Sequence, residues 1–272
     1  MNIVSQRATA SIALFLFSVL ATPCDALGKT KLKQIRHIVL DPGHGGTNPG
    51  APSVTGVYEK HITLPIALEI EKQLREATDV NVTLTRRGDT SIGLRERTRL
   101  ANDAGGDLLI SIHCNSSENP DANGLEVYFL DPEAAVTEFE SLVEREEQGE
   151  ADAQSPETPA GETATTPGEE KGPLSIDQVL LDASFYKSHE RSEVLAGTLL
   201  DTIHKVAKIP RRKVRQAAFA VLKEARMPAV VLEVGYLSHA VEGKKLIDPN
   251  YQEIIARGVV KALLAFDKTV PR

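Results

Sequence analysis

Four polar side chains stand at or beside the ends of short apolar runs, where an enzyme could present them to a substrate. They are His44 after "HIVLDPG", Glu59 in "VYEKH", His113 at the end of "LLISIH" and Glu233 at the end of "VVLE". Two imidazoles and one carboxylate that leave a fourth position open are a common ligand set of catalytic zinc. The sequence therefore predicts one Zn²⁺ held by His44, Glu59 and His113. A further carboxylate, here Glu233, can then act as the general base.

Each of these residues also has an ordinary structural interpretation. A histidine at a strand end is often only hydrogen-bonded, and Glu59 alone could be a loop acid. His37 and His61 lie nearby in the sequence and stay open as alternative ligands. Glu233 is harder to explain structurally, because a carboxylate inside "AVVLEVGYL" loses its hydration and needs a partner. Magnesium and calcium fit less well than zinc, because both ions prefer oxygen ligands alone.

The glycines around His44 do not match a phosphate-binding loop. A P-loop needs a lysine directly after its last glycine, and a dinucleotide-binding turn needs G-x-G-x-x-G at the start of a helix. The segment "DPGHGGTNPG" has neither pattern, and Pro49 interrupts it. We therefore expect these glycines to supply unusual backbone angles that orient His44.

Strand and helix patterns alternate along most of the chain. Short apolar runs typical of buried strands cover residues 36–43, 80–86, 107–115, 123–130 and 228–238. Amphipathic helices are predicted over 61–77, 90–105, 192–207 and 250–266, with a strand and turn over 214–225. The second of these helices is expected to have Thr90 or Ser91 as its N-cap, and Pro65 is expected to lie in the first turn of the first helix.

This alternation predicts a single α/β domain with a twisted, mainly parallel sheet flanked by helices on both faces. Sites in such sheets form beyond the carboxyl ends of the strands. His44, His113 and Glu233 all stand at such ends. The predicted fold therefore brings them together.

The alternation stops over residues 131–173. The first part has the pattern of a helix, and the rest is a mixture of Pro, Gly, Thr, Ala and Glu that is typical of a disordered linker. This segment holds thirteen acidic residues against Arg145 and Lys171, a net charge of −11, whereas the whole chain carries −7. Because residues 1–26 are neutral overall, the rest of the chain carries about +4. We predict an acidic insertion within a mildly basic domain.

The first 26 residues have the order of a secretory signal peptide. One arginine precedes an apolar run over residues 12–21, and small residues follow. The run is shorter than the roughly 20 apolar residues that a membrane span needs. An uncleaved signal anchor and a lipidated Cys24 stay open as alternatives. We predict a signal peptide over 1–26, a short linker over 27–35 and one catalytic domain over 36–268.

Over residues 36–266, apart from the acidic insertion, the sequence resembles a known family. The family is that of the zinc-dependent type 3 N-acetylmuramoyl-L-alanine amidases, which split septal peptidoglycan during bacterial cell separation. The resemblance rests on an ordered set of motifs: "IVLDPGHGGTNPGA", the glutamate of "VYEKHITLPIA", "TRRGDTSIGLRERTRLAN", "LLISIHCNSS", "GLEVYFL" and "AAFAVLKEARMPAVVLEVGYLSH". It implies that His44, Glu59 and His113 hold the metal and that Glu233 is the catalytic glutamate. Together with the signal peptide it implies a periplasmic enzyme that hydrolyses the amide bond between N-acetylmuramic acid and L-alanine.

Gram-negative members of that family often carry an insertion whose helix plugs the active site. The stretch "FESLVEREEQGE" is similar to that helix, and the resemblance implies that Glu146 is an autoinhibitory zinc ligand. Glu144 stays open as the alternative, and a solvated acidic linker is the other interpretation of the whole segment. An inhibitory helix implies an activator protein that displaces it.

Two other functions share parts of this pattern. A zinc peptidoglycan carboxypeptidase or other peptidase uses the same metal chemistry, and a non-catalytic wall-binding regulator could keep the same fold. The expected partners are peptidoglycan and the activator protein. Neither nucleic acid nor a stable membrane anchor is expected.

Overall fold

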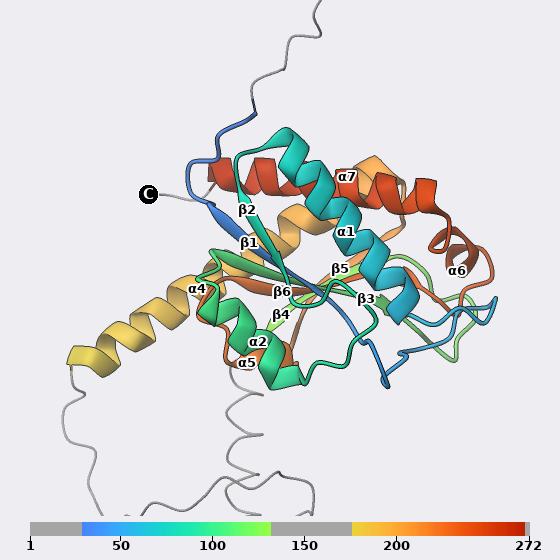
Figure 1. Ribbon diagram of the computed structural model, residues 1–272, viewed down its shortest axis with the longest axis horizontal. Coiled ribbons are helices and arrows are strands. Elements are labelled where there is room, and N and C mark those ends of the chain that lie inside the picture. The colour runs from blue at the N-terminus through green and yellow to red at the C-terminus, as the bar shows by residue number, and fades with distance from the viewer. Residues whose placement is uncertain (1–28, 132–175, 270–272) are drawn as a thin grey trace, which may run out of the picture.

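The computed structural model describes residues 29–131 and 176–269 (Figure 1). The signal peptide predicted over 1–26 lies outside the described residues. So does the insertion predicted over 131–173, apart from Asp131, and with it the proposed inhibitory residue Glu146. The linker predicted over 27–35 and the domain predicted over 36–268 are described from residue 29 onward, apart from residues 132–175.

One six-stranded sheet forms the centre of the structure, in the order β2-β1-β3-β6-β4-β5. Neighbouring strands are parallel except for β4 and β6, which pair antiparallel. The predicted mainly parallel α/β sheet is therefore confirmed. The strands are β1 (His37–Pro42), β2 (Asn81–Leu84), β3 (Leu108–Asn115), β4 (Leu125–Leu130), β5 (Arg211–Ala217) and β6 (Ala229–Tyr236).

Helices cover both faces of this sheet, as predicted (Figure 1). One face carries α1 (Lys60–Ala77), α4 (Ile176–Ala207) and α7 (Pro249–Thr269), which pack against one another. The opposite face carries α2 (Leu94–Asp103) and the short α5 (Ala220–Lys223), and α6 (Glu242–Lys245) follows β6. Because both faces are covered, the strands are apolar on both sides, which explains their nearly continuous apolar runs.

The buried side chains form two clusters that correspond to the two faces. Ile38 and Leu40 of β1 belong to the larger cluster, whereas Val39 between them belongs to the smaller one. Successive side chains in a strand point to opposite faces, so Asp41 continues the side of Val39. His113 and Glu233 continue the same side of β3 and β6, which the smaller cluster occupies with α2 and α5. Asp41, His113 and Glu233 thus lie on the same side of the sheet as the smaller cluster, next to its apolar residues.

Two predicted helix starts were wrong, those of α2 and of α4, which begins at Ile176 and not at 192. Helix α2 begins at Leu94, with Gly93 as its N-cap, and not at Thr90 or Ser91. The side chains expected to cap it act elsewhere, because Ser91 Oγ accepts a hydrogen bond from the backbone N–H of Thr47 at 3.0 Å. Helix α1 begins at Lys60, which places Pro65 inside the helix beyond its first turn.

Candidate active site

His44 and His113 both contact the carboxylate of Glu59. Glu59 Oε2 lies 3.0 Å from His44 Nε2, and Glu59 Oε1 lies 3.0 Å from His113 Nδ1. One possible ligand atom from each residue lies within 4.8 Å of the others, and the two imidazole rings meet edge to face at 4.9 Å. Three donor atoms that come together in this way could hold a metal ion. The structure thus gathers the three predicted ligands from the turn after β1, the N-cap of α1 and strand β3.

The turn after β1 leaves space for these side chains only because it contains glycine. A methyl group added at Gly43 would overlap the His113 ring, and one added at Gly50 would lie 2.6 Å from Cβ of Glu59. His44 itself has a positive φ of 58°, an uncommon angle for a residue with a side chain. The glycines therefore make room for the imidazole and carboxylate groups, while His44 adopts the unusual backbone angle.

Two buried arginines hold the backbone of that turn. Arg97 donates to the carbonyl of His44 at 2.7 Å and pairs with Asp41 at 2.8 Å. Arg86 donates to the carbonyl of Gly43 at 2.7 Å. Each arginine is less than 5% exposed. These bonds favour the uncommon backbone angle at His44, which supports the orientation of its ring.

Hydrogen bonds also fix the ligand side chains. Asn48 Oδ1 lies 2.9 Å from His44 Nδ1, which leaves His44 Nε2 facing Glu59. The backbone N–H of Cys114 donates to Glu59 Oε1 at 2.9 Å. Burial raises the pKa of the Glu59 carboxyl, but hydrogen bonds from His113 and His44 lower it by more, to about 2. Glu59 therefore stays ionised, which is the form that binds a metal.

Glu233 lies beside this group, opposite His113 in the β3–β6 pair. Its Oε2 is buried and has no hydrogen-bond partner in the described part of the chain. Burial raises the pKa of the Glu233 carboxyl to about 7, and the negative charges of Glu59 and Glu126 add to the effect, while His113 opposes it. A carboxyl with this pKa can accept and release a proton near neutral pH.

Glu126 is a second buried carboxylate in the same row, and the sequence analysis did not single it out. It pairs with Glu233 across the antiparallel β4–β6 ladder and is only 2% exposed. Arg212 Nε donates to Glu126 Oε1 at 2.6 Å, and the Tyr128 hydroxyl donates to Oε2 at 2.7 Å. The signal was present in "GLEVYFL", where an acid interrupts an apolar run as Glu233 does in "VVLEV".

The family of N-acetylmuramoyl-L-alanine amidases matches residues 38–265. The chain belongs to this family. The expected resemblance is thereby confirmed, and the family is one of hydrolases.

Individual relatives agree with this assignment. The chain is 34% identical to N-acetylmuramoyl-L-alanine amidase AmiA of Escherichia coli K12, over 85% of this chain and 76% of that protein. It is 33% identical to the probable amidase AmiB of Haemophilus influenzae, over 93% of this chain but only 54% of the relative. The crystal structure of an N-acetylmuramoyl-L-alanine amidase from Clostridium difficile 630 superposes with a TM-score of 0.64 at 27% identity, covering 88% of this chain and all of the other.

The alternative ligands, His37 and His61, do not join the group of His44, Glu59 and His113. His37 Nε2 lies 2.8 Å from Thr83 Oγ1, at the start of β1, and His61 is exposed on α1. Among the described residues, His44, Glu59 and His113 are the one group of histidine, cysteine and acidic side chains placed to hold a metal.

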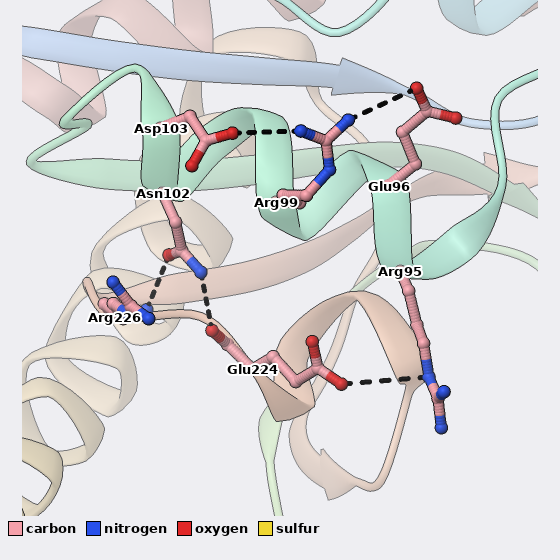
Figure 2. A pocket seen from close by; sticks show the side chains of 7 residues that line it. All are labelled: Arg95, Glu96, Arg99, Asn102, Asp103, Glu224 and Arg226. Atoms are coloured by element: carbon pink, nitrogen blue, oxygen red, sulfur yellow. Dashed lines mark hydrogen bonds and ion pairs between the residues drawn. The ribbon is translucent and has the colours of Figure 1, made fainter. Parts of the chain in front are cut away.

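A hollow between α2 and the end of α5 is separate from these residues (Figure 2). Its charged groups bind one another: Arg99 pairs with Asp103 at 3.2 Å, and Asn102 donates to the carbonyl of Glu224 at 2.9 Å. Because the Asn102 side chain connects α2 with the segment after α5, where it also accepts a hydrogen bond from the backbone N–H of Arg226 at 3.0 Å, we interpret the hollow as structural. Its lining consists of Arg95, Glu96, Arg99, Asn102, Asp103, Glu224 and Arg226.

No helix within the described ranges has the length and apolar character needed to cross a membrane.

Proposed function

We propose that this chain is a zinc-dependent amidase that hydrolyses the bond between N-acetylmuramic acid and L-alanine in peptidoglycan. One observation carries the proposal: the buried, unpartnered carboxylate of Glu233 lies beside a convergent group of two histidines and Glu59. The membership in the amidase family supports the choice of substrate. The donor set of two nitrogens and one carboxylate fits zinc.

His44, Glu59 and His113 would hold the metal, and Glu233 would move the proton. When bound, zinc supplies Lewis acidity to the scissile carbonyl and to the attacking water. Glu233 accepts a proton from that water and then donates it to the departing amine of L-alanine. Arg97, Arg86 and the glycines keep the His44 turn in place during these steps.

Replacement of Glu233 by glutamine tests this role. We expect Glu233→Gln to reduce the release of stem peptide by about 100-fold or more, because the amide cannot accept the proton. Zinc content and the unfolding temperature should stay unchanged. The assay is digestion of purified peptidoglycan followed by mass spectrometry of the soluble products.

The control variant is Glu224→Gln, which changes an exposed acid paired with Arg95 at 3.8 Å. It should retain full activity. The products also separate the alternatives, since an amidase releases whole stem peptides that begin with free L-alanine. Shortened peptides would instead indicate a carboxypeptidase, and full activity of Glu233→Gln would contradict the assigned role.

We further propose that the enzyme is periplasmic and acts in septal wall splitting and cell separation. The support is the signal-like order of residues 1–26 and the resemblance of the chain to cell-separation amidases. Residues 131–173 would regulate it, with Glu146 as the inhibitory ligand and an activator protein that displaces the segment.

A further inference from the structure

Two arginines on the edge strand β5 share one buried carboxylate next to Glu233. Arg212 Nε lies 2.6 Å from Glu126 Oε1, and Arg215 Nε lies 3.8 Å from the same atom. Two guanidinium groups therefore surround a single negative charge. The cluster of Arg212, Arg215 and Glu126 keeps one excess positive charge beside the proposed catalytic residue.

Arg212 is held in place from several sides. It donates to the carbonyl of Asn123 at 3.3 Å, and its guanidinium group lies 5.2 Å from the centre of the Tyr236 ring. Glu126 is also fixed, because it accepts hydrogen bonds from Tyr128 and from Asn115. Arg212 and Glu126 therefore lose little side-chain entropy when an anion binds.

Arg215 remains available for a ligand. Its side chain is 49% exposed, and it makes no hydrogen bond within the described part of the chain. The neighbouring Arg211 has a similar exposure of 48%, but it is paired with Asp201 at 2.6 Å, outside this cluster. An arginine fork with free N–H groups binds a carboxylate through two parallel hydrogen bonds.

The cluster lies on the side of Glu233 that faces away from His113. Because Glu233 gives its proton to the departing amine, the released peptide begins beside Glu233, and a peptide that crosses β6 toward β4 reaches the cluster. The guanidinium groups lie against Glu126 on β4, one strand and so about 5 Å beyond β6. An extended peptide advances about 3.4 Å per residue. The arginines therefore lie near the second residue of the stem peptide.

The chemistry of the substrate supplies an anion at that point. The N-acetylated sugars of the glycan are neutral, whereas a stem glutamate linked through its side chain keeps a free α-carboxylate. We propose that Arg212 and Arg215 form a subsite for the carboxylate of the second stem residue and that Glu126 positions both arginines. This inference rests on the proposed amidase function.

Two synthetic substrates that differ in one charge test the subsite. Both are N-acetylmuramoyl tripeptides, one with a free α-carboxylate on the second residue and the other with a carboxamide there. We expect the zinc-loaded full chain to cleave the carboxylate form with a kcat/KM about tenfold higher, because a bidentate arginine pair is worth roughly this factor.

Arg215→Met should abolish that preference, bringing the two kcat/KM values within about twofold. Its kcat/KM on the carboxamide substrate should fall much less than on the carboxylate substrate, since the carboxamide lacks the charge. Arg215 is preferred to Arg212 for this test because loss of Arg212 would leave Glu126 buried without its closest cation. The matched control is Arg211→Met, which removes an equally exposed charge from the same strand and should keep the tenfold preference.

Binding without turnover gives an independent measurement. In the Glu233→Gln background, titration calorimetry should show about tenfold weaker binding of the carboxylate substrate after Arg215→Met. Equal cleavage of both substrates by the unchanged enzyme, or a preference that survives Arg215→Met, would overturn the subsite while leaving the amidase function intact. If the unchanged enzyme cleaves neither substrate and no intact peptidoglycan, the proposed function itself fails.

Discussion

Glu59 contacts both imidazoles at once, one through each carboxylate oxygen. At the scale of single residues, this arrangement explains why the pKa of Glu59 falls to about 2, whereas the pKa of Glu233 rises to about 7. Glu59 has two histidines and two backbone N–H groups around it, whereas Glu233 has two carboxylates nearby and an unpartnered oxygen. These opposite environments fit the proposed roles of the two glutamates, Glu59 as a metal ligand and Glu233 as a proton carrier.

Asn48 provides a test of how the His44 ring is oriented. Its Oδ1 lies 2.9 Å from His44 Nδ1, so Asn48→Ala removes the group that holds the ring. We expect zinc affinity, measured by competition with a chelator, to fall by about tenfold, because such supporting bonds typically contribute this much. Asn48 is exposed, so the unfolding temperature of the metal-free protein should stay the same.

The control for this measurement is Asn102→Ala. Asn102 also makes side-chain hydrogen bonds, but it lies on α2 at the hollow of Figure 2. Its replacement should leave zinc affinity unchanged. Unaltered affinity in Asn48→Ala would show that the ring keeps its orientation without this bond.

At the scale of elements, periodicity was enough to predict the six strands and the four long helices, but not the short helices α5 and α6. The apolar faces of α1 and α7 repeat as a helix requires, and β1, β3 and β6 are apolar on both sides because helices cover both faces. The start of α2 could not be predicted in this way, because Asp89 and Ser91 bond to the turn after β1 and not to their own helix. Contacts between distant segments decided that boundary.

The same limit applies to the site. The four predicted residues could be identified because their types suggest chemistry together and because His44, His113 and Glu233 stand at strand ends. Arg86, Arg97 and Glu126 act through the backbone or side chains of other elements, so their roles became visible only in the folded structure.

Glu71 joins α1 to the segment after β2 and makes stability depend on pH. It is 6% exposed and accepts hydrogen bonds from Arg87 and, at 2.7 Å, from Arg75. Burial alone raises the pKa of the Glu71 carboxyl, but these two arginines lower it by more, so that the pKa falls below its ordinary value of 4.5. Its contribution to stability is therefore complete above that value and is lost as pH falls through the lowered pKa.

Glu71→Gln should consequently lower the free energy of unfolding at pH 7 by about 1 kcal/mol, a value kept small because both arginines are largely exposed. At pH 3 the difference from the unchanged protein should shrink. Urea denaturation at the two pH values measures both quantities. Glu69→Gln, on the same helix with an exposed partner in Lys72, is the control and should change little at either pH. A constant difference at both pH values would contradict the assigned ion pairs.

At the scale of the whole molecule, charge is unevenly distributed along the chain. Residues 131–173 carry a net charge of −11, while the chain outside this segment and residues 1–26 carries about +4. The insertion follows directly on β4, the strand that also carries Glu126. At low ionic strength, an acidic segment tethered to this strand is attracted to cationic groups near it, such as Arg212 and Arg215 of β5. This attraction weakens as the salt concentration increases.

This distribution leads to a prediction about regulation. Replacing residues 131–173 with a short glycine-serine linker should raise the basal rate of peptidoglycan cleavage, because the chain would lose the segment proposed to inhibit it. Glu146→Ala should give the same increase without altering the length of the chain, whereas Glu144→Ala should not, since only one of the two acids is proposed as the ligand. Dye release from labelled peptidoglycan measures all three rates, with zinc content determined in parallel. If neither the linker variant nor Glu146→Ala exceeds the unchanged enzyme, the segment is a plain acidic linker; if Glu144→Ala alone is activated, the ligand is Glu144.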